Sequence, residues 1–281
     1  METFLNNFSF LFLLFSMLFY WVNAFFNINI FYYFGKLTII FANLSLFCFL
    51  IYTIFTKNHF PISNLYEVLI FLSWCFTNIH LILEKNNFTI GIIIVPISLF
   101  LNAFARLRLP ESFQKVTPLI PALKSNWLIM HVTVILLSYV TIICGCLLSI
   151  SYIYIYKLKT KNIFTYKKYI FITKKRYNLL KKLDKLSFRI INMGFPLLTI
   201  GIISGSIWAN EAWGSYWNWD PKEIWSLITW IVFAIYLHFR LNKNWNGIKS
   251  AILATFGFLV IWICFLGVNF ISKGLHSYGK F

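Results

Sequence analysis

Charged residues are scarce in this chain, and acidic ones are the scarcest. Only 12% of the 281 residues are charged and 59% are hydrophobic, with eight Asp and Glu against 25 Lys and Arg. A soluble domain of this length needs a more polar surface, so the composition excludes that class and indicates a polytopic membrane protein. An alternating barrel pattern is also missing, which leaves helices as the spanning structures.

Motifs for metal binding, redox chemistry and secretion are missing as well. The cysteines lie inside apolar runs and form no CxxC pair, so neither a zinc site nor a dithiol redox motif is supported. We interpret them as small buried hydrophobic residues. No Lys or Arg precedes the first apolar run and no small-residue cleavage site follows it, which predicts a retained helix rather than a signal peptide. The five cysteines are Cys48, Cys75, Cys144, Cys146 and Cys264.

Eight apolar runs approach the roughly 20 residues that a helix needs to cross the hydrocarbon of a bilayer. We therefore predict an all-α integral membrane protein with about eight transmembrane helices in one domain, residues 1–281. The run that contains Pro96 is the weakest, so seven or six helices are the alternatives. The runs cover residues 8–26, 37–56, 65–83, 88–105, 127–156, 190–209, 224–240 and 249–271.

Basic residues concentrate in one segment, which predicts the orientation. Residues 157–189 hold 12 Lys or Arg and one acid, Asp184. By the positive-inside rule we expect a solvated loop here, on the stromal or cytoplasmic side, and not a nucleic-acid site. Alternation then assigns 17 of the 25 basic residues to that side. Both termini and residues 208–225 are expected on the opposite, lumenal or periplasmic, side.

The most unusual stretch is WANEAWGSYWNWDPKEIW, residues 208–225, with five tryptophans and four charged residues between two apolar runs. A belt of tryptophans at the lipid headgroups is one interpretation. We favour a platform for a flat conjugated ligand, because aromatic faces offer rigid apolar area. Asp220, Pro221 and Glu223 have the spacing of a helix start with a capping box. General acid–base chemistry is the less favoured role for these two carboxylates.

The predicted topology brings two histidines to the side of this stretch. His131 lies one turn into the fifth run and His276 lies beyond the eighth. Two neutral imidazoles are typical axial ligands of a haem iron, and a macrocycle needs flat apolar walls. His238 is expected deep in the seventh helix, either snorkelling to the inner interface or acting as an intramembrane ligand. We assign structural roles to His59 and His80.

Residues 208–225 resemble the WWD signature of the haem-handling proteins of cytochrome c maturation. Further segments resemble the CcsA family, the plastid-encoded form in particular, over nearly the whole chain. These segments are HFPISNLYEVLIFLSW (59–74), VTPLIPALKSNWLIMHVTVILLSY (116–139), residues 190–240 and GVNFISKGLHSYGKF (267–281).

The resemblance implies a subunit of the system II cytochrome c synthase, a haem lyase complex. Such a subunit delivers b-type haem across the membrane and presents it on residues 208–225 for attachment to CXXCH apocytochromes. The implied partners are a CcsB-type membrane protein, the apocytochrome c and a thioredoxin-like thiol reductant. The implied location is the plastid thylakoid membrane, with the bacterial inner membrane as the alternative. The resemblance also implies that a CcsB histidine pairs with His238.

The residues that we assign to haem binding combine this resemblance with the pattern. The three histidines are expected as iron ligands, and the other residues as contacts of the macrocycle. No residue is assigned a catalytic acid–base role. The set is His131, His276, His238, Trp208, Trp213, Trp217, Trp219 and Asp220.

Three other functions remain open. The first is a haem exporter or relay with no part in ligation. The second is a secondary transporter, which would predict interrupted helices in both halves of the fold. The third is a purely structural assembly subunit.

Overall fold

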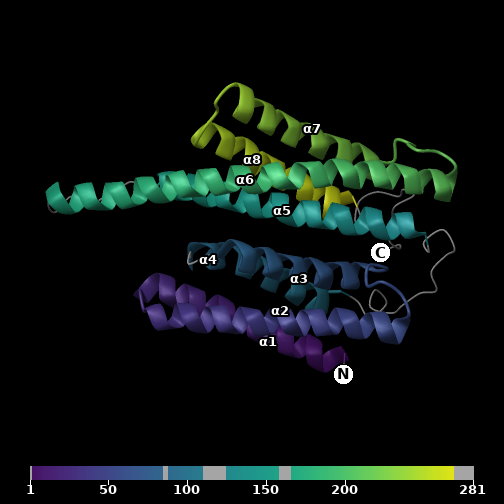
Figure 1. The fold of residues 1–281 in the computed structure, drawn as a ribbon, viewed down its shortest axis with the longest axis horizontal. Helices are drawn as coiled ribbons and strands as arrows, with labels where there is room; N and C mark the ends of the chain where they lie inside the picture. Colours follow the sequence, from purple (N-terminus) through teal and green to yellow (C-terminus); the bar gives the residue numbers. More distant parts are fainter. Residues whose placement is uncertain (1, 85–87, 110–124, 158–165, 269–281) are drawn as a thin grey trace. The chain divides into compact units, whose positions relative to one another are not determined.

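The computed structural model describes residues 2–84, 88–109, 125–157 and 166–268 (Figure 1). Over these ranges the structure contains no strand, and eight helices are long and apolar enough to cross a membrane. This confirms the predicted all-α membrane class. The elements are α1 (Glu2–Phe26), α2 (Asn29–Lys57), α3 (Leu65–Glu84), α4 (Phe88–Leu107), α5 (Asn126–Lys157), α6 (Tyr166–Trp213), α7 (Pro221–Asn242), α8 (Ile248–Trp262) and the π-helix η3 (Ile263–Gly267).

The chain divides into two compact units, where the sequence led us to expect one domain. Residues 1–132 form unit 1, which contains α1 to α4, and residues 133–281 form unit 2. Helix α5 begins in unit 1 and continues in unit 2. Each unit is an up-and-down bundle in which consecutive helices run in opposite directions.

Helix α1 buries polar residues and exposes aromatic ones, which is the reverse of a soluble helix. Its exposed side chains include Phe4, Phe8 and Phe15. Between helices in lipid there is no hydrophobic driving force, so small and polar side chains form the interfaces. This pattern fits α1 for contact with hydrocarbon. Its buried positions recur every three or four residues, at Asn6, Ser9, Leu13, Ser16, Tyr20 and Asn23.

Contacts at the two ends of unit 1 fix its helix directions. Lys57, at the end of α2, forms an ion pair of 3.0 Å with Glu2 at the start of α1. Near the other ends of their helices, the Tyr20 hydroxyl lies 3.1 Å from Nε2 of His80 on α3. Helices α1 and α3 are therefore parallel to each other, and α2 is antiparallel to both.

The structure of the basic segment, residues 157–189, differs from the solvated loop that we predicted. From Tyr166 onward it is helical, as the first half of the 48-residue α6, the longest helix in Figure 1. Leu183 and Ser187 are buried one turn apart, whereas Lys185 between them is exposed. Lys and Arg are good helix formers, and no Gly or Pro interrupts this part of the helix. The loop assignment was wrong because the high charge concealed a helical period.

Helices α5 and α6 approach each other closely in unit 2, because glycine leaves room for a neighbouring side chain. A Cβ on Gly145 would lie 2.5 Å from Cγ1 of Ile191. A Cβ on Gly201 would lie 2.8 Å from Cδ1 of Ile135. Since the later α6 residue contacts the earlier α5 residue, the two helices are antiparallel.

An ion pair connects the helices of unit 2 at the end where α7 finishes and α8 begins. Arg240 on α7 donates from Nη1 and Nη2 to the two carboxylate oxygens of Asp184 on α6, at 2.8 and 2.7 Å. Such bidentate pairs are the strong and directional ones. Arg240 also donates to Oγ of Ser250 on α8 at 2.8 Å. The one acid in the basic segment therefore joins α6, α7 and α8.

Candidate functional site

Residues 208–225 join the end of α6 to the start of α7. Helix α6 ends at Trp213, and the amide of Gly214 donates to the carbonyl of Asn210 at 2.9 Å. Gly214 has a φ of +76°, a left-handed conformation that ends many helices and that glycine adopts without steric penalty. The chain then leaves regular structure until α7 begins at Pro221.

The start of α7 has the predicted capping box. The Asp220 carboxylate accepts from the Lys222 amide at 3.2 Å, and the Glu223 carboxylate accepts from the Asp220 amide at 3.2 Å. Pro221 occupies the first helical position, where a backbone N–H would have no partner within the helix, so its absence loses no hydrogen bond. Both carboxylates are buried. The structural role that we favoured for Asp220 and Glu223 is confirmed.

Glu223 has a second contact that the capping motif does not require. The same oxygen, Oε2, also accepts from the Asn218 amide at 2.8 Å. The two amides that flank Trp219 thus converge on one carboxylate, an anion-binding arrangement of the nest type. Trp219 itself has a φ of +55°. A non-glycine residue in this region is strained by about 1–3 kcal/mol and persists only where its surroundings hold it.

The strained backbone presents an exposed indole. The Trp219 side chain is 68% exposed, and its ring meets Trp217 edge to face, with centroids 6.0 Å apart. In contrast, Trp208 is buried and packs edge to face against Trp213 at 4.8 Å. Four of the five tryptophans therefore form two edge-to-face pairs rather than one flat wall. The Trp219 ring is available to a ligand and Trp217 is half-buried beside it, whereas Trp208 is buried.

Two more elements, α5 and η3, reach this end of unit 2. Tyr139 on α5 shares a hydrogen bond of 3.4 Å with Sγ of Cys264 on η3, and η3 also contacts α7. His131 lies two turns before Tyr139 on the continuous α5 and is half-buried. His276 lies outside the described residues. Helices α5, α7 and η3 meet here, while the predicted approach of His131 and His276 stays a prediction.

His238 lies in the last turn of α7, at the opposite end of that helix from the tryptophans. It is 17 residues beyond Pro221, or roughly 26 Å along the axis at 1.5 Å per residue. Its side chain is exposed, and Nδ1 lies 3.1 Å from Nδ2 of Asn242. The imidazole is therefore accessible to a molecule outside this chain. This position is compatible with both predictions from the sequence, a snorkelling group and an intramembrane ligand.

The family model described as "Cytochrome C assembly protein" matches residues 62–276, which include the tryptophan-rich segment and His131, His238 and His276. This chain belongs to the cytochrome c assembly family.

Full-length relatives narrow the assignment to CcsA within that family. The chain is 51% identical to the cytochrome c biogenesis protein CcsA of Mesostigma viride, over 100% of this chain and 97% of that protein. It is 44% identical to the CcsA of Microcystis aeruginosa, over 100% of this chain and 98% of that one. The family resemblance inferred from the motifs is thus confirmed, and with it a role in cytochrome c maturation.

A solved structure shares the fold of this CcsA-family chain. The cytochrome c haem lyase CcmF matches with a TM-score of 0.64 at 15% identity. The match covers 95% of this chain and 48% of the lyase. At this identity the likeness concerns the fold alone.

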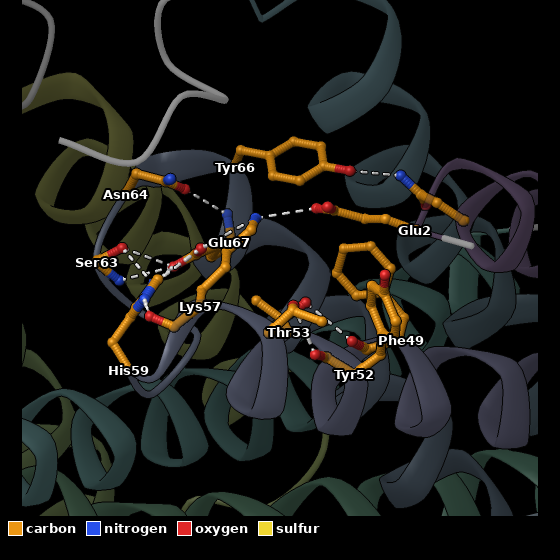
Figure 2. A network of polar contacts seen from close by, with 12 residues as sticks. Glu2, Phe49, Tyr52, Thr53, Lys57, His59, Ser63, Asn64, Tyr66 and Glu67 are labelled. Carbon is orange, nitrogen blue, oxygen red and sulfur yellow. Dashed lines mark hydrogen bonds and ion pairs between the residues drawn. The ribbon is translucent and has the colours of Figure 1, made fainter.

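His59 of the CcsA-family chain is fully engaged in a polar network, shown in Figure 2. Its Nδ1 faces the Lys57 carbonyl at 3.1 Å, and its Nε2 faces the Glu67 carboxylate at 3.1 Å. The Ser63 hydroxyl donates to the same carboxylate at 2.7 Å. Both ring nitrogens are engaged by protein groups, so neither is directed at an iron. The structural role expected for His59 fits this geometry.

His80 was also expected to be structural, but its environment is unusual. It is completely buried on α3, and its Nδ1 has no hydrogen-bond partner. The sequence offered one signal, which is that Glu84 follows one turn later on the same face of an apolar helix. Ionisable groups inside spans tend to mark functional positions.

The remaining metal-binding chemistry is limited. In the part of the chain that the structure describes, no group of three or more His, Cys, Asp or Glu side chains could hold a metal ion. All five cysteines are free; four are buried, as expected, whereas Cys48 is exposed on α2.

Two substitutions of Trp219 separate its ring from its backbone. Trp219→Ala and Trp219→Gly should both weaken haem retention, by about 0.5–1.5 kcal/mol beyond the lost apolar area. The glycine variant should be the more stable by about 1–2 kcal/mol, because glycine tolerates the left-handed conformation. Denaturation in SDS and haem content per protein measure the two effects. Asp220→Ala is the matched control, with about 1 kcal/mol lost from the helix cap. Wild-type haem content in both Trp219 variants would remove this ring from the site.

Proposed function

We propose that this chain is the haem-handling subunit of a system II cytochrome c synthase. It carries b-type haem across the membrane and presents it on residues 208–225 for attachment to CXXCH apocytochromes. The observation that carries the proposal is the exposed Trp219 ring with the half-buried Trp217 beside it, in a strained loop that Glu223 holds. Membership of the cytochrome c assembly family supplies the substrate class.

The proposed site uses these side chains for positioning. His131 and His276 supply two neutral imidazoles to the haem iron, one on each face. The apolar macrocycle lies against Trp217 and Trp219, which form a corner of two perpendicular faces. Trp213 extends this surface, whereas Trp208 and Asp220 support it by packing and by capping α7.

The chemistry needs little acid–base catalysis from this chain. Each thioether forms when a substrate thiol adds across a haem vinyl group. The sulfur bonds to one vinyl carbon and the thiol proton ends on the other, without net oxidation. Correct placement of thiols and vinyl groups therefore limits the rate. The free cysteines of this chain form no pair that could reduce a substrate disulfide. We therefore propose a separate thioredoxin-like reductant as a partner.

His238 is the proposed ligand at the other end of α7. Its exposed ring fits a haem held jointly with an imidazole of a CcsB-type membrane partner. The secondary-transporter alternative gains no support, because it requires an interrupted helix in each half, whereas in the described ranges α4 and α6 continue as helices through Pro96 and Pro196.

We propose the plastid thylakoid membrane as the location, with the bacterial inner membrane as the alternative. The relatives include algal and cyanobacterial proteins. In this proposal both termini and residues 208–225 face the lumen or periplasm.

Single-cysteine labelling tests this orientation. In a variant without the native cysteines, Ser215→Cys lies before α7 and Asn244→Cys lies after it. An impermeant maleimide should label position 215 from the lumenal or periplasmic side and position 244 only from the other. Labelling of both positions from one side would refute the topology.

An assay for covalent cytochrome c tests the proposed function. This chain and a CcsB-type partner should be expressed with an apocytochrome in a host without other maturation proteins. Haem attached to cytochrome c should form with both proteins and with neither alone. Haem export without attachment would identify a relay instead of a synthase subunit.

A further inference from the structure

A second polar cluster lies inside unit 1, at the end where α1 leads into α2. Tyr20 and His80 are completely buried, and Glu84 is 1% exposed. The Tyr20 hydroxyl donates to Oε1 of Glu84 at 2.6 Å and lies 3.1 Å from Nε2 of His80. One residue of α1 thus bridges two ionisable residues that lie one turn apart on α3.

The hydrogen bonds determine where the protons lie. Tyr20 has a single hydroxyl proton, and the short bond to the Glu84 carboxylate uses it. The Tyr20 oxygen must then accept from His80, so Nε2 of His80 carries a proton. In neutral imidazole the other nitrogen, Nδ1, is then a bare acceptor.

The open hydrogen-bonding positions of unit 1 concentrate here. Six buried side-chain nitrogen or oxygen atoms lack a partner in the described ranges, and three of them are His80 Nδ1, Glu84 Oε2 and Tyr32 Oη. An unsatisfied buried group costs about 1–3 kcal/mol and calls for an explanation. Tyr32 is close enough to Glu84 to interact with it electrostatically. The Nδ1 lone pair of His80 therefore remains open in a buried site.

Tight packing limits what this site can bind. The Tyr20 ring fits between Gly35 and Gly91, where an added Cβ would lie 3.3 and 2.7 Å from ring atoms. A macrocycle has no room against such a ring, but a proton needs none. The groups that interact with His80 are Tyr20 from α1, Lys36 from α2 and Glu84 from α3, and Tyr32 from α2 interacts with Glu84. Helix α4 contributes Gly91, without a charge.

We propose that His80 and Glu84, held by Tyr20, form a proton-binding site in unit 1, in which Nδ1 of His80 takes up one proton. The proton comes from water and converts the neutral imidazole into an imidazolium beside the carboxylate. The His80–Glu84 separation, 3.9 Å between Nε2 and Oε2, is within ion-pair range. Protonation strengthens the polar link between α1 and α3, so the packing of unit 1 responds to proton uptake. This site is independent of haem.

Nitrogen NMR of the full-length protein in lipid nanodiscs tests the proposal directly. With ¹⁵N-labelled histidine, the His80 signals are those lost in His80→Gln. If that variant does not fold, replacing each of the other four histidines by Gln identifies His80 as the remaining set. At neutral pH, Nε2 should be protonated and Nδ1 bare, and acidification should protonate Nδ1. A His80 that is doubly protonated at every pH, or whose Nδ1 never binds a proton in the folded protein, would overturn the proposal.

Three variants test the roles of the neighbours. Glu84→Gln should lower the pH at which Nδ1 binds its proton by about one unit or more, because it removes the opposite charge. Tyr20→Phe should distribute the bare nitrogen over both ring positions. Glu67→Gln is the matched control on the same helix and should change the His59 signals alone. An equal shift of the His80 transition in Glu67→Gln, or no shift in Glu84→Gln, would refute the pairing.

Discussion

Replacement of His131 or His276 by glycine is expected to abolish cytochrome c maturation, and millimolar imidazole is expected to restore part of it. In the proposed site each residue supplies one of two axial imidazoles, so either loss leaves the iron with one protein ligand. Loss of a group that merely orients a metal ligand costs about 10–100-fold, and loss of the ligand itself should exceed that. Glycine leaves a space that an imidazole molecule can enter, while the other histidine and the Trp217–Trp219 pair still hold the ring. The measurement is the yield of covalent cytochrome c with and without imidazole.

The double variant and a neighbouring histidine provide the controls. His131→Gly with His276→Gly should recover much less, because no fixed ligand remains to orient the ring. His59→Gly should keep its activity, since both nitrogens of His59 are engaged by groups of the protein itself. Equal imidazole rescue of the single and double variants would show that the imidazole acts elsewhere.

Replacement of His238 by alanine is expected to lower the haem content of the complex with the CcsB-type partner several-fold. His238 is exposed in the last turn of α7, at the far end of the helix from the tryptophans. In the proposed function, haem enters at this end of α7. Loss of a ligand here should therefore reduce haem loading before any step at residues 208–225. Haem that is already bound at the tryptophan-rich segment should keep its spectrum.

Leu241→Ala is the matched control for His238, because Leu241 is 60% exposed on the same turn and carries no ligand. It should leave haem loading unchanged. Haem content is measured per protein after purification of the complex. Normal loading and maturation in His238→Ala would leave only the snorkelling interpretation.

The sequence predicted the parts of the fold that depend on local signals. The positions of the apolar runs matched eight helices, and Asp220, Pro221 and Glu223 specified the start of α7 to the residue. Such signals need no information from elsewhere in the chain. The start of α6 at Tyr166 was missed, because a high density of Lys residues resembles a solvated loop until the burial of Leu183 and Ser187 shows the period.

Local sequence signals also predicted only part of the candidate site. The composition of residues 208–225 identified the aromatic segment, but not that Trp208 is buried while Trp219 is exposed. The backbone beside Trp219 is held by a Glu223 contact to the Asn218 amide, which no spacing rule describes. His80 was assigned a structural role because a single sequence cannot show that Tyr20, 60 residues earlier, is its partner. Long-range polar pairs inside a membrane bundle are visible only in three dimensions.

The reduced absorption spectrum of the purified protein in complex with its CcsB-type partner tests the central claim most directly. The claim is that this chain holds haem between His131 and His276 beside the tryptophan-rich segment. The wild-type complex should show the low-spin spectrum of bis-histidine haem. His131→Gly and His276→Gly should each lose that spectrum and regain it in part with imidazole. An unchanged bis-histidine spectrum in either single variant would contradict the account and remove that histidine from the site.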